Sequence, residues 1–276
     1  MADFNIIGSG AAGIAAAQAI RREDKRSRIR LFTNDVHGYY SRPGLAYWLA
    51  GEVPQNQLFP FQKNYFQDLK IEIIPQAVQS IYPTQHLLRT HNNQQFPYDR
   101  LLLATGAAAA MPNTPGVELD GVVKLDSMED TAEILKKVRR ARVAVVVGGG
   151  ITALELAEGL AASGLSVHYF LRAERYWSNV LDEVESRMVE AHLKQNGIQL
   201  HYFTDLQEIY GRNGKVNAVL AQEQGKNIEL PCQIVAFAIG IKPRLALALQ
   251  AGLQTQRGVI VDSGLHSSHA DVFAAG

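Results

Sequence analysis

Cysteine is almost absent from this chain, since Cys232 is the only one among 276 residues. A single thiol excludes an internal disulfide and any Cys-x-x-Cys redox pair or zinc site within the chain. Because Cys232 stands at the start of a late apolar strand pattern, we expect a buried structural thiol there. Chemistry that needs two neighbouring sulfur atoms is thereby excluded.

An excess of charge of one sign is also lacking, because 27 Lys and Arg residues balance 27 Asp and Glu residues. This balance argues against nucleic acid or an anionic membrane surface as a partner. No apolar run has the length of a membrane span, and no secretory signal pattern opens the chain. We therefore expect a soluble, cytoplasmic protein. Its length and its 47% hydrophobic residues predict about two domains.

A glycine-rich turn lies between an apolar run and an alanine-rich helical pattern near the start of the chain. The turn comprises Gly8, Ser9, Gly10, Ala11, Ala12 and Gly13. In a dinucleotide-binding turn, Gly8 would permit the sharp bend, Gly10 would let a pyrophosphate approach the backbone, and Gly13 would let the helix pack close to its strand. The alternative is a glycine turn without a ligand, and the strand–turn–helix context favours binding.

An acid is expected about 20 residues beyond such glycines, at the end of the next strand, where it accepts hydrogen bonds from a ribose. The strand pattern of residues 28–32 is followed by Asn34 and Asp35. We predict Asp35 for this role, with Asn34 as a neutral substitute. The alternative is that Asp35 is an ordinary loop acid.

A second turn of the same kind follows the β-branched run of residues 142–147. It comprises Gly148, Gly149, Gly150, Ile151, Thr152 and Ala153, with alanine in the third glycine position. A helical pattern that includes Glu155 follows it. Two such turns in one chain, each between a strand and a helix, are far more specific than one.

An arginine stands where the second turn's acid would be expected. The strand of residues 164–171 is followed by Arg172, with Arg175 close behind. An arginine at this place can pair with the 2′-phosphate of NADPH, so the pattern favours NADPH. The alternative is that both arginines are ordinary surface charges and that NADH is also used.

Small residues end two further apolar strand patterns, at Ala104-Thr105-Gly106 and at Ala238-Ile239-Gly240, and a last strand pattern runs into Ala274-Ala275-Gly276. Small residues at the carboxyl end of a parallel strand let a flat ligand or a neighbouring backbone come close. His266 and His269 lie near the last of these patterns. They have no third ligand nearby, so we do not expect a metal site.

The ordered set of these pieces resembles the flavoprotein reductases of the pyridine nucleotide-disulfide oxidoreductase class, and more narrowly the rubredoxin and ferredoxin reductases. The resemblance covers essentially the whole chain. Besides the two turns and the three strand ends, it includes the segment Tyr40-Ser41-Arg42-Pro43. It implies an α/β fold of two Rossmann-like FAD- and NAD(P)-binding domains of the three-layer ββα type, the second inserted in the first.

The resemblance also implies the domain boundaries. We expect an FAD-binding domain in two segments, 1–118 and 241–276, with an NAD(P)H-binding domain at 119–240 between them. In the family, the last motif continues into the rest of the FAD domain and a C-terminal interface domain. A homodimer is expected where that domain is present.

The resemblance assigns the site residues. Arg42 and Glu155 are expected in catalysis, Arg42 beside the flavin and Glu155 near the nicotinamide, although either could have a purely structural or solvated role. The residues expected to bind FAD or NAD(P)H are Gly8, Ser9, Gly10, Ala11, Ala12, Gly13, Asn34, Asp35, Arg42, Pro43, Val78, Ala104, Thr105, Gly106, Gly148, Gly150, Ile151, Thr152, Ala153, Glu155, Arg172, Arg175, Ile239, Gly240 and Gly276.

The expected activity follows from these cofactors. Hydride would pass from NADPH or NADH to FAD, and electrons would then go to an external acceptor such as a small rubredoxin- or ferredoxin-like carrier. Two alternatives stay open: a nucleotide-binding module without turnover that belongs to a larger assembly, and an NAD(P)H oxidase that uses oxygen or a quinone.

Overall fold

The computed structural model describes every residue from Met1 to Gly276 and divides them into two compact units. The first unit comprises Met1–Tyr40, Phe59–Ala108 and Lys242–Gly276, and the second comprises Ser41–Leu58 and Ala109–Ile241. These bounds differ from the expected segments, chiefly because Ser41–Leu58 belongs to the second unit. Strands β8 (Ala107–Ala109) and β17 (Ile241–Pro243) pair with each other where the chain passes between the units.

A parallel sheet of five strands, in the order β18-β7-β1-β2-β3, forms the centre of the first unit. The strands are β1 (Asp3–Ile7), β2 (Arg28–Phe32), β3 (Ile71–Ile74), β7 (Arg100–Leu103) and β18 (Val272–Ala274). Residues on both faces are buried, as a parallel sheet requires: Leu31 belongs to one core and Leu103 to the other.

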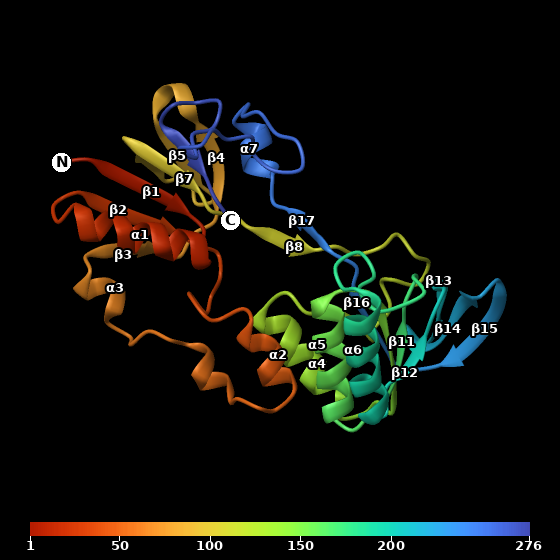
Figure 1. Ribbon diagram of the computed structural model, residues 1–276. Coiled ribbons are helices and arrows are strands. Elements are labelled where there is room, and N and C mark those ends of the chain that lie inside the picture. The colour runs from red at the N-terminus through yellow and green to blue at the C-terminus, as the bar shows by residue number, and fades with distance from the viewer. The chain divides into compact units, whose positions relative to one another are not determined.

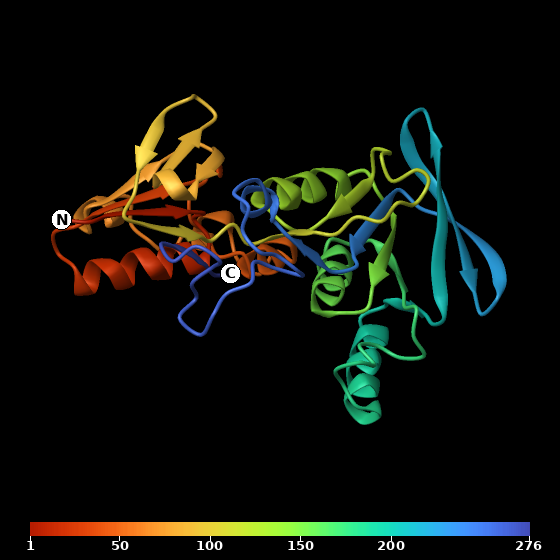
Figure 2. The ribbon, with the colours of Figure 1, turned by 90° about the horizontal axis from the view of Figure 1, so that it is seen from above.

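Different layers cover the two faces of this sheet. Helix α1 (Ala11–Glu23) packs on the face of Leu31, while the antiparallel strands and the short helix α7 (Ala246–Gln250) pack on the face of Leu103. Figure 2 shows α1 on one side of the red strands and the yellow antiparallel strands on the other. The remaining elements are β4 (Val78–Tyr82), β5 (Leu87–Thr90), β6 (Gln95–Pro97), the 3-10 turn η2 (Pro83–Gln85) and α3 (Tyr65–Asp68).

The second unit repeats this architecture. Its parallel sheet has the order β12-β11-β10-β16-β9, and α4, α5 and α6 pack on one face while an antiparallel sheet of β13, β14 and β15 packs on the other (Figure 1). The elements are β9 (Val122–Lys124), α4 (Met128–Val138), β10 (Val143–Gly148), α5 (Ile151–Ala162), β11 (Ser166–Phe170), α6 (Glu183–Gln195), β12 (Gln199–His201), β13 (Thr204–Arg212), β14 (Lys215–Glu223), β15 (Lys226–Pro231) and β16 (Ile234–Ala238). The predicted three-layer α/β fold is therefore confirmed in both units.

Local sequence explains where these elements begin. The valines of β10 have side chains buried in alternating directions, Val146 towards the helices and Val145 towards the antiparallel sheet, so a continuous β-branched run suits this central strand. Helix α4 begins with a capping box, in which Ser127 Oγ accepts a hydrogen bond from the amide of Asp130 at 3.1 Å. Asp182 caps α6 in the same way.

Residues 41–58 join the second unit through helix α2 (Gly44–Leu49), which is followed by the 3-10 turn η1 (Gln55–Leu58). Leu49 is 1% exposed and belongs to the same core as Leu156 and Leu160 of α5. The contact is close because α5 carries glycine there: a Cβ atom on Gly159 would lie 2.7 Å from Leu49 Cγ. None of the helices in either unit has the length and apolar character needed to cross a membrane.

We predict that Leu49→Ala lowers the free energy of unfolding by about 2–5 kcal/mol, because it leaves a cavity in a filled core. Tyr47→Ala, on the exposed side of the same helix, should change it by about 0.5 kcal/mol or less. Chemical denaturation followed by circular dichroism measures both. Equal effects of the two variants would contradict the packing of α2 in the second unit.

Candidate functional site

The first glycine turn lies between β1 and α1, and packing explains two of its three glycines. Gly8 has a φ of 117°, and a Cβ atom there would lie 2.1 Å from the carbonyl oxygen of Ala104. A Cβ atom on Gly13 would lie 1.9 Å from the carbonyl oxygen of Gly8. Since real Cβ atoms do not approach backbone so closely, Gly8 and Gly13 are required by the fold itself.

Gly10 differs, because no protein atom lies within 4 Å of where its Cβ would stand. It is the N-cap of α1, and no side chain caps the helix there. The amides of the first turn therefore point towards an open, electropositive space, which is the environment that a pyrophosphate needs. The residues present at this turn thus fit a dinucleotide such as FAD.

The predicted acid Asp35 lies beside this turn. Its amide donates to Thr33 Oγ1 at 3.1 Å, and the same oxygen lies 2.7 Å from Ser9 Oγ of the turn. One oxygen of the Asp35 carboxylate accepts a hydrogen bond from the amide of His37 at 3.0 Å. Asn34 adjoins them in sequence. Thr33, which the sequence analysis did not single out, links the acid to the turn.

The predicted strand ends of the first unit converge on the same edge of its sheet. The amide of Ala104 donates to the carbonyl of Ile7 at 2.8 Å, and the amide of Ala275 donates to that of Leu103 at 3.0 Å. Gly276 lies next to α1, since a Cβ there would be 3.3 Å from Ala12 Cβ. Carboxyl ends of parallel strands are where such folds bind their ligands.

Arg244 forms hydrogen bonds with residues 105–107, the segment that follows β7. Thr105 Oγ1 donates to the carbonyl of Arg244 at 3.0 Å, the Arg244 amide donates to the carbonyl of Gly106 at 2.9 Å, and its guanidinium donates to that of Ala107. The sequence analysis did not identify Arg244, because the two segments lie 139 residues apart. Val78, also predicted to bind cofactor, is buried in β4 with the core beneath this sheet.

In the second glycine turn, too, packing requires glycine at the first position but not at the middle one. A Cβ atom on Gly148 would lie 2.3 Å from the carbonyl oxygen of Ala238 and 2.8 Å from Ala153 Cβ, so packing requires glycine there. A Cβ atom on Gly150 would meet nothing closer than Trp177 Nε1 at 3.8 Å, which is an ordinary contact. Gly149 and Gly150 therefore leave space that a ligand could use, whereas Gly148 does not.

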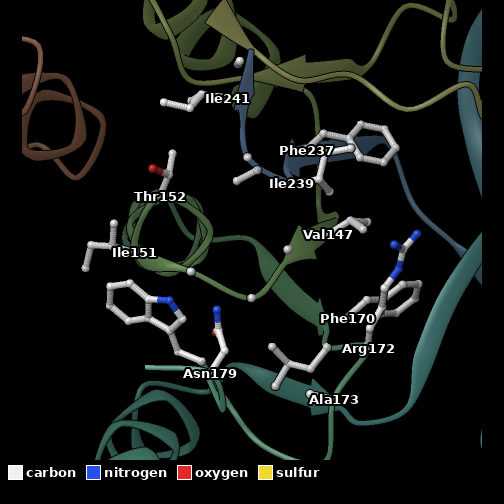
Figure 3. A pocket seen from close by; sticks show the side chains of 18 of the residues that line it. Val147, Ile151, Thr152, Phe170, Arg172, Ala173, Asn179, Phe237, Ile239 and Ile241 are labelled. Atoms are coloured by element: carbon white, nitrogen blue, oxygen red, sulfur yellow. The ribbon is translucent and has the colours of Figure 1, made fainter. Parts of the chain in front are cut away.

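A cavity of about 540 Å³ opens at this second turn (Figure 3). Most of its lining residues come from the ranges 147–152, 170–173 and 237–241, which are the ends of β10, β11 and β16. Predicted residues that line it are Gly148, Gly150, Ile151, Thr152, Arg172, Arg175, Ile239 and Gly240. Figure 3 shows Thr152 and Ile151 at the start of α5, with Arg172 across the cavity. Ala153 instead is fully buried beneath the turn.

The two predicted arginines have different partners. Arg172, with its side chain 74% exposed, donates from Nε to Asp205 Oδ1 at 2.7 Å. Arg175 is more buried; its Nη1 lies 2.5 Å from Glu174 Oε1 and its Nη2 donates to the carbonyl of Ser178 at 3.1 Å. Arg175 therefore stabilises the loop that follows β11 through contacts within that loop.

Trp177 belongs to that loop and also lines the cavity. Its φ of 48° is a left-handed conformation that a bulky residue rarely adopts. Such local strain is commonly retained where a side chain must be held at a site. The indole edge faces Gly150, a glycine that packing does not require. The sequence offered no signal for Trp177, because its approach to the turn depends on the loop conformation.

Glu155 and the segment with Arg42 also belong to the second unit. Glu155 lies one turn into α5 but does not line the cavity. Burial, with a smaller contribution from the Glu158 carboxylate, raises the pKa of Glu155. Arg42 Nη1 donates at 2.6 Å to the carbonyl of Asp126, a residue that lines the cavity, and Pro43 follows as the N-cap of α2.

The single cysteine belongs to a core of the second unit. Cys232 is fully buried in the core between the second unit's two sheets, and burial raises its pKa to about 12. A thiol with so high a pKa is not a nucleophile at neutral pH. His266 Nδ1 pairs with Asp262 Oδ1 at 3.2 Å, and no group of three or more His, Cys, Asp or Glu residues is positioned to hold a metal ion.

Known proteins are similar to this chain in sequence and in fold. The family described as pyridine nucleotide-disulphide oxidoreductase matches residues 2–276. A rubredoxin-NAD(+) reductase of Pseudomonas putida is 30% identical over 98% of this chain and 70% of its own length. A nitric oxide reductase FlRd-NAD(+) reductase of Aeromonas hydrophila is 32% identical over 98% of this chain and 69% of its own length.

A solved structure agrees with these sequence relatives. The ferredoxin reductase from Rhodopseudomonas palustris matches with a TM-score of 0.93 and 30% identity, over 100% of this chain and 68% of that one. These similarities confirm the predicted resemblance, the predicted NAD(P)H oxidoreductase class and the predicted pair of cofactors, FAD and a pyridine nucleotide. The chain belongs to the pyridine nucleotide-disulphide oxidoreductase family.

Proposed function

We propose that this chain transfers hydride from NAD(P)H to FAD and passes the electrons to a small carrier protein of the rubredoxin or ferredoxin kind. The observation that carries this proposal is the pair of middle glycines. Packing does not require glycine at Gly10 in one unit or at Gly150 in the other, so each position leaves space for a ligand. Each also lies at a helix N-terminus that no side chain caps. Two dinucleotides, one in each unit, are what such a pair can hold.

The residues of each unit have distinct roles in this proposal. In the first unit, Gly10 and the α1 amides would hold the FAD pyrophosphate, and Asp35 a ribose. In the second unit, Gly150, Thr152 and the α5 amides would hold the pyridine nucleotide. Bound FAD supplies a flavin that accepts hydride and can release electrons singly. Arg42 beside the flavin and Glu155 near the nicotinamide are further parts of the proposal.

The acceptor must lie outside the chain. Family members of the disulfide-reducing kind need two sulfur atoms in reach of each other, and this chain has one buried cysteine. The relatives named above reduce rubredoxin or FlRd, and the solved neighbour is a ferredoxin reductase. Their names support a small electron-carrier protein as the acceptor here. The expected domain boundaries, the cytoplasmic location and the homodimer stay predictions.

A visible spectrum tests the proposed reaction. The purified chain supplied with FAD should show flavin absorbance, and anaerobic NADH or NADPH should bleach it. Addition of oxidised rubredoxin should then restore the absorbance faster than air does. Failure to take up FAD would contradict the reductase proposal, whereas faster recovery in air than with rubredoxin would favour the oxidase alternative.

The two kinds of glycine should respond differently to a methyl group. Gly150→Ala should leave the free energy of unfolding nearly unchanged but weaken NAD⁺ binding about tenfold or more, because the methyl group occupies the ligand's space. Gly148→Ala should instead destabilise the fold by about 1–3 kcal/mol through overpacking. Calorimetric titration and chemical denaturation separate the two effects. Tight NAD⁺ binding by the Gly150 variant would contradict the assigned role.

Glu155 should make stability depend on pH. Because its pKa is raised in the fold, its ionised form is disfavoured there, so stability is lost as the pH rises above the ordinary value of 4.5. Glu155→Gln should therefore be more stable than the parent at neutral pH, and the difference should vanish in acid. Glu229→Gln, an exposed change on β15, should show no such trend. Denaturation at several pH values measures this, and a difference that grows in acid would contradict it.

A further inference from the structure

We propose that Asp205 sets a preference for NADH over NADPH, an inference that rests on the proposed binding of a pyridine nucleotide by the second unit. Dinucleotide folds usually carry an acid at the end of the second strand, where it binds the ribose of NADH. In this chain that strand, β11, ends without one, and Arg172 occupies the place. Asp205, on β13, brings a carboxylate to Arg172, which lines the cavity.

Both oxygens of the Asp205 carboxylate accept a hydrogen bond from a side chain. Arg172 Nε donates to Oδ1 at 2.7 Å, and Gln207 Nε2 donates to Oδ2 at 3.2 Å. An ionised carboxylate has about four acceptor sites, so acceptor capacity is left for a ribose hydroxyl. Arg172 lines the cavity itself, on the side where Phe170 and Ala173 lie (Figure 3).

The position of Asp205 does not depend on its ion pair. The preceding residues are hydrogen-bonded to the segment after β11: the amide of Thr204 donates to the carbonyl of Leu171 at 2.9 Å, and that of Phe203 donates to the carbonyl of Ala173 at 3.2 Å. Backbone pairing therefore keeps Asp205 beside the end of β11 even when the exposed Arg172 side chain moves. An exposed ion pair is itself weak and breaks readily.

Arg175, the second cationic residue of this region, is not available to bind a 2′-phosphate in place of Arg172. Arg175 pairs with Glu174 and donates to the carbonyl of Ser178, and its Nε is buried without a hydrogen-bond partner. Its guanidinium is thus committed to the loop. A 2′-phosphate that pairs with Arg172 would lie near the fixed negative charge of Asp205, whose repulsion offsets part of the attraction.

NADH and NADPH should therefore interact differently with the Asp205 carboxylate. The ribose hydroxyl of NADH is uncharged and can donate to the carboxylate, as it does to the acid of other dinucleotide folds. The 2′-phosphate of NADPH must displace Asp205 from Arg172 or bind against repulsion. Asp205 is thus a residue that decides specificity, through its own charge and through the position of Arg172.

Titration calorimetry with NAD⁺ and NADP⁺ on the purified FAD-loaded protein tests this inference. Asp205→Asn should lower the ratio of the NADP⁺ to the NAD⁺ dissociation constant about fivefold or more, an effect that shrinks at high salt. Asp205→Glu should keep the parental ratio within about a factor of two. Glu208→Gln removes a carboxylate of the same strand that does not pair with Arg172, and it should leave the ratio unchanged.

A double variant separates the two ways in which Asp205 acts. With Arg172→Gln already present, Asp205→Asn should have a smaller effect on the ratio, because only direct repulsion is left to remove. An unchanged ratio in Asp205→Asn, or weaker NADP⁺ binding, would overturn the inference while the proposed function stands. A parent protein that binds neither nucleotide would overturn both.

Discussion

The close approach of each glycine turn to the end of the neighbouring parallel strand, which a Cβ atom would block, is the constraint on which both units depend. In the first unit a Cβ on Gly8 would collide with the carbonyl of Ala104, and in the second a Cβ on Gly148 would collide with that of Ala238. Each collision involves the carboxyl end of the neighbouring parallel strand. The turn, the strand end and the helix N-terminus are thereby held at one place.

The consequence is a division of roles within each turn. Packing requires glycine at outer positions such as Gly8 and Gly13, whereas the middle glycine leaves the space in which we propose that a ligand binds. The same division in two separately folded units explains how one chain of this family handles two dinucleotides. The single buried Cys232 removes the dithiol route, so the chemistry depends on the two cofactors and on an acceptor outside the chain.

Much of this could be predicted from sequence, because the informative signals are local. The strand–turn–helix patterns around Gly8 and Gly148 and the small residues that end β7 and β16 each occupy a few consecutive residues. Parallel strands bury both faces, so their apolar runs were also visible. The three-layer fold and the placement of most second-turn residues around the cavity follow from these patterns.

The residues that sequence analysis missed depend on contacts between distant segments. Thr33 reaches Ser9 across 24 residues, Asp205 reaches Arg172 across 33, and Arg244 reaches Thr105 across 139. No periodicity or spacing reveals such pairs. The membership of residues 41–58 in the second unit has the same origin, since it depends on the fit of Leu49 against a glycine of α5.

Hydrogen exchange measured by mass spectrometry tests the central claim most directly, because it locates each nucleotide on the chain. With FAD alone, the account predicts slower exchange of the amides around Gly10 and Asp35. With NAD⁺ alone, it predicts slower exchange around Gly150 and Arg172. Protection of the second turn by FAD, or of neither turn by either nucleotide, would contradict the assignment of one dinucleotide to each unit.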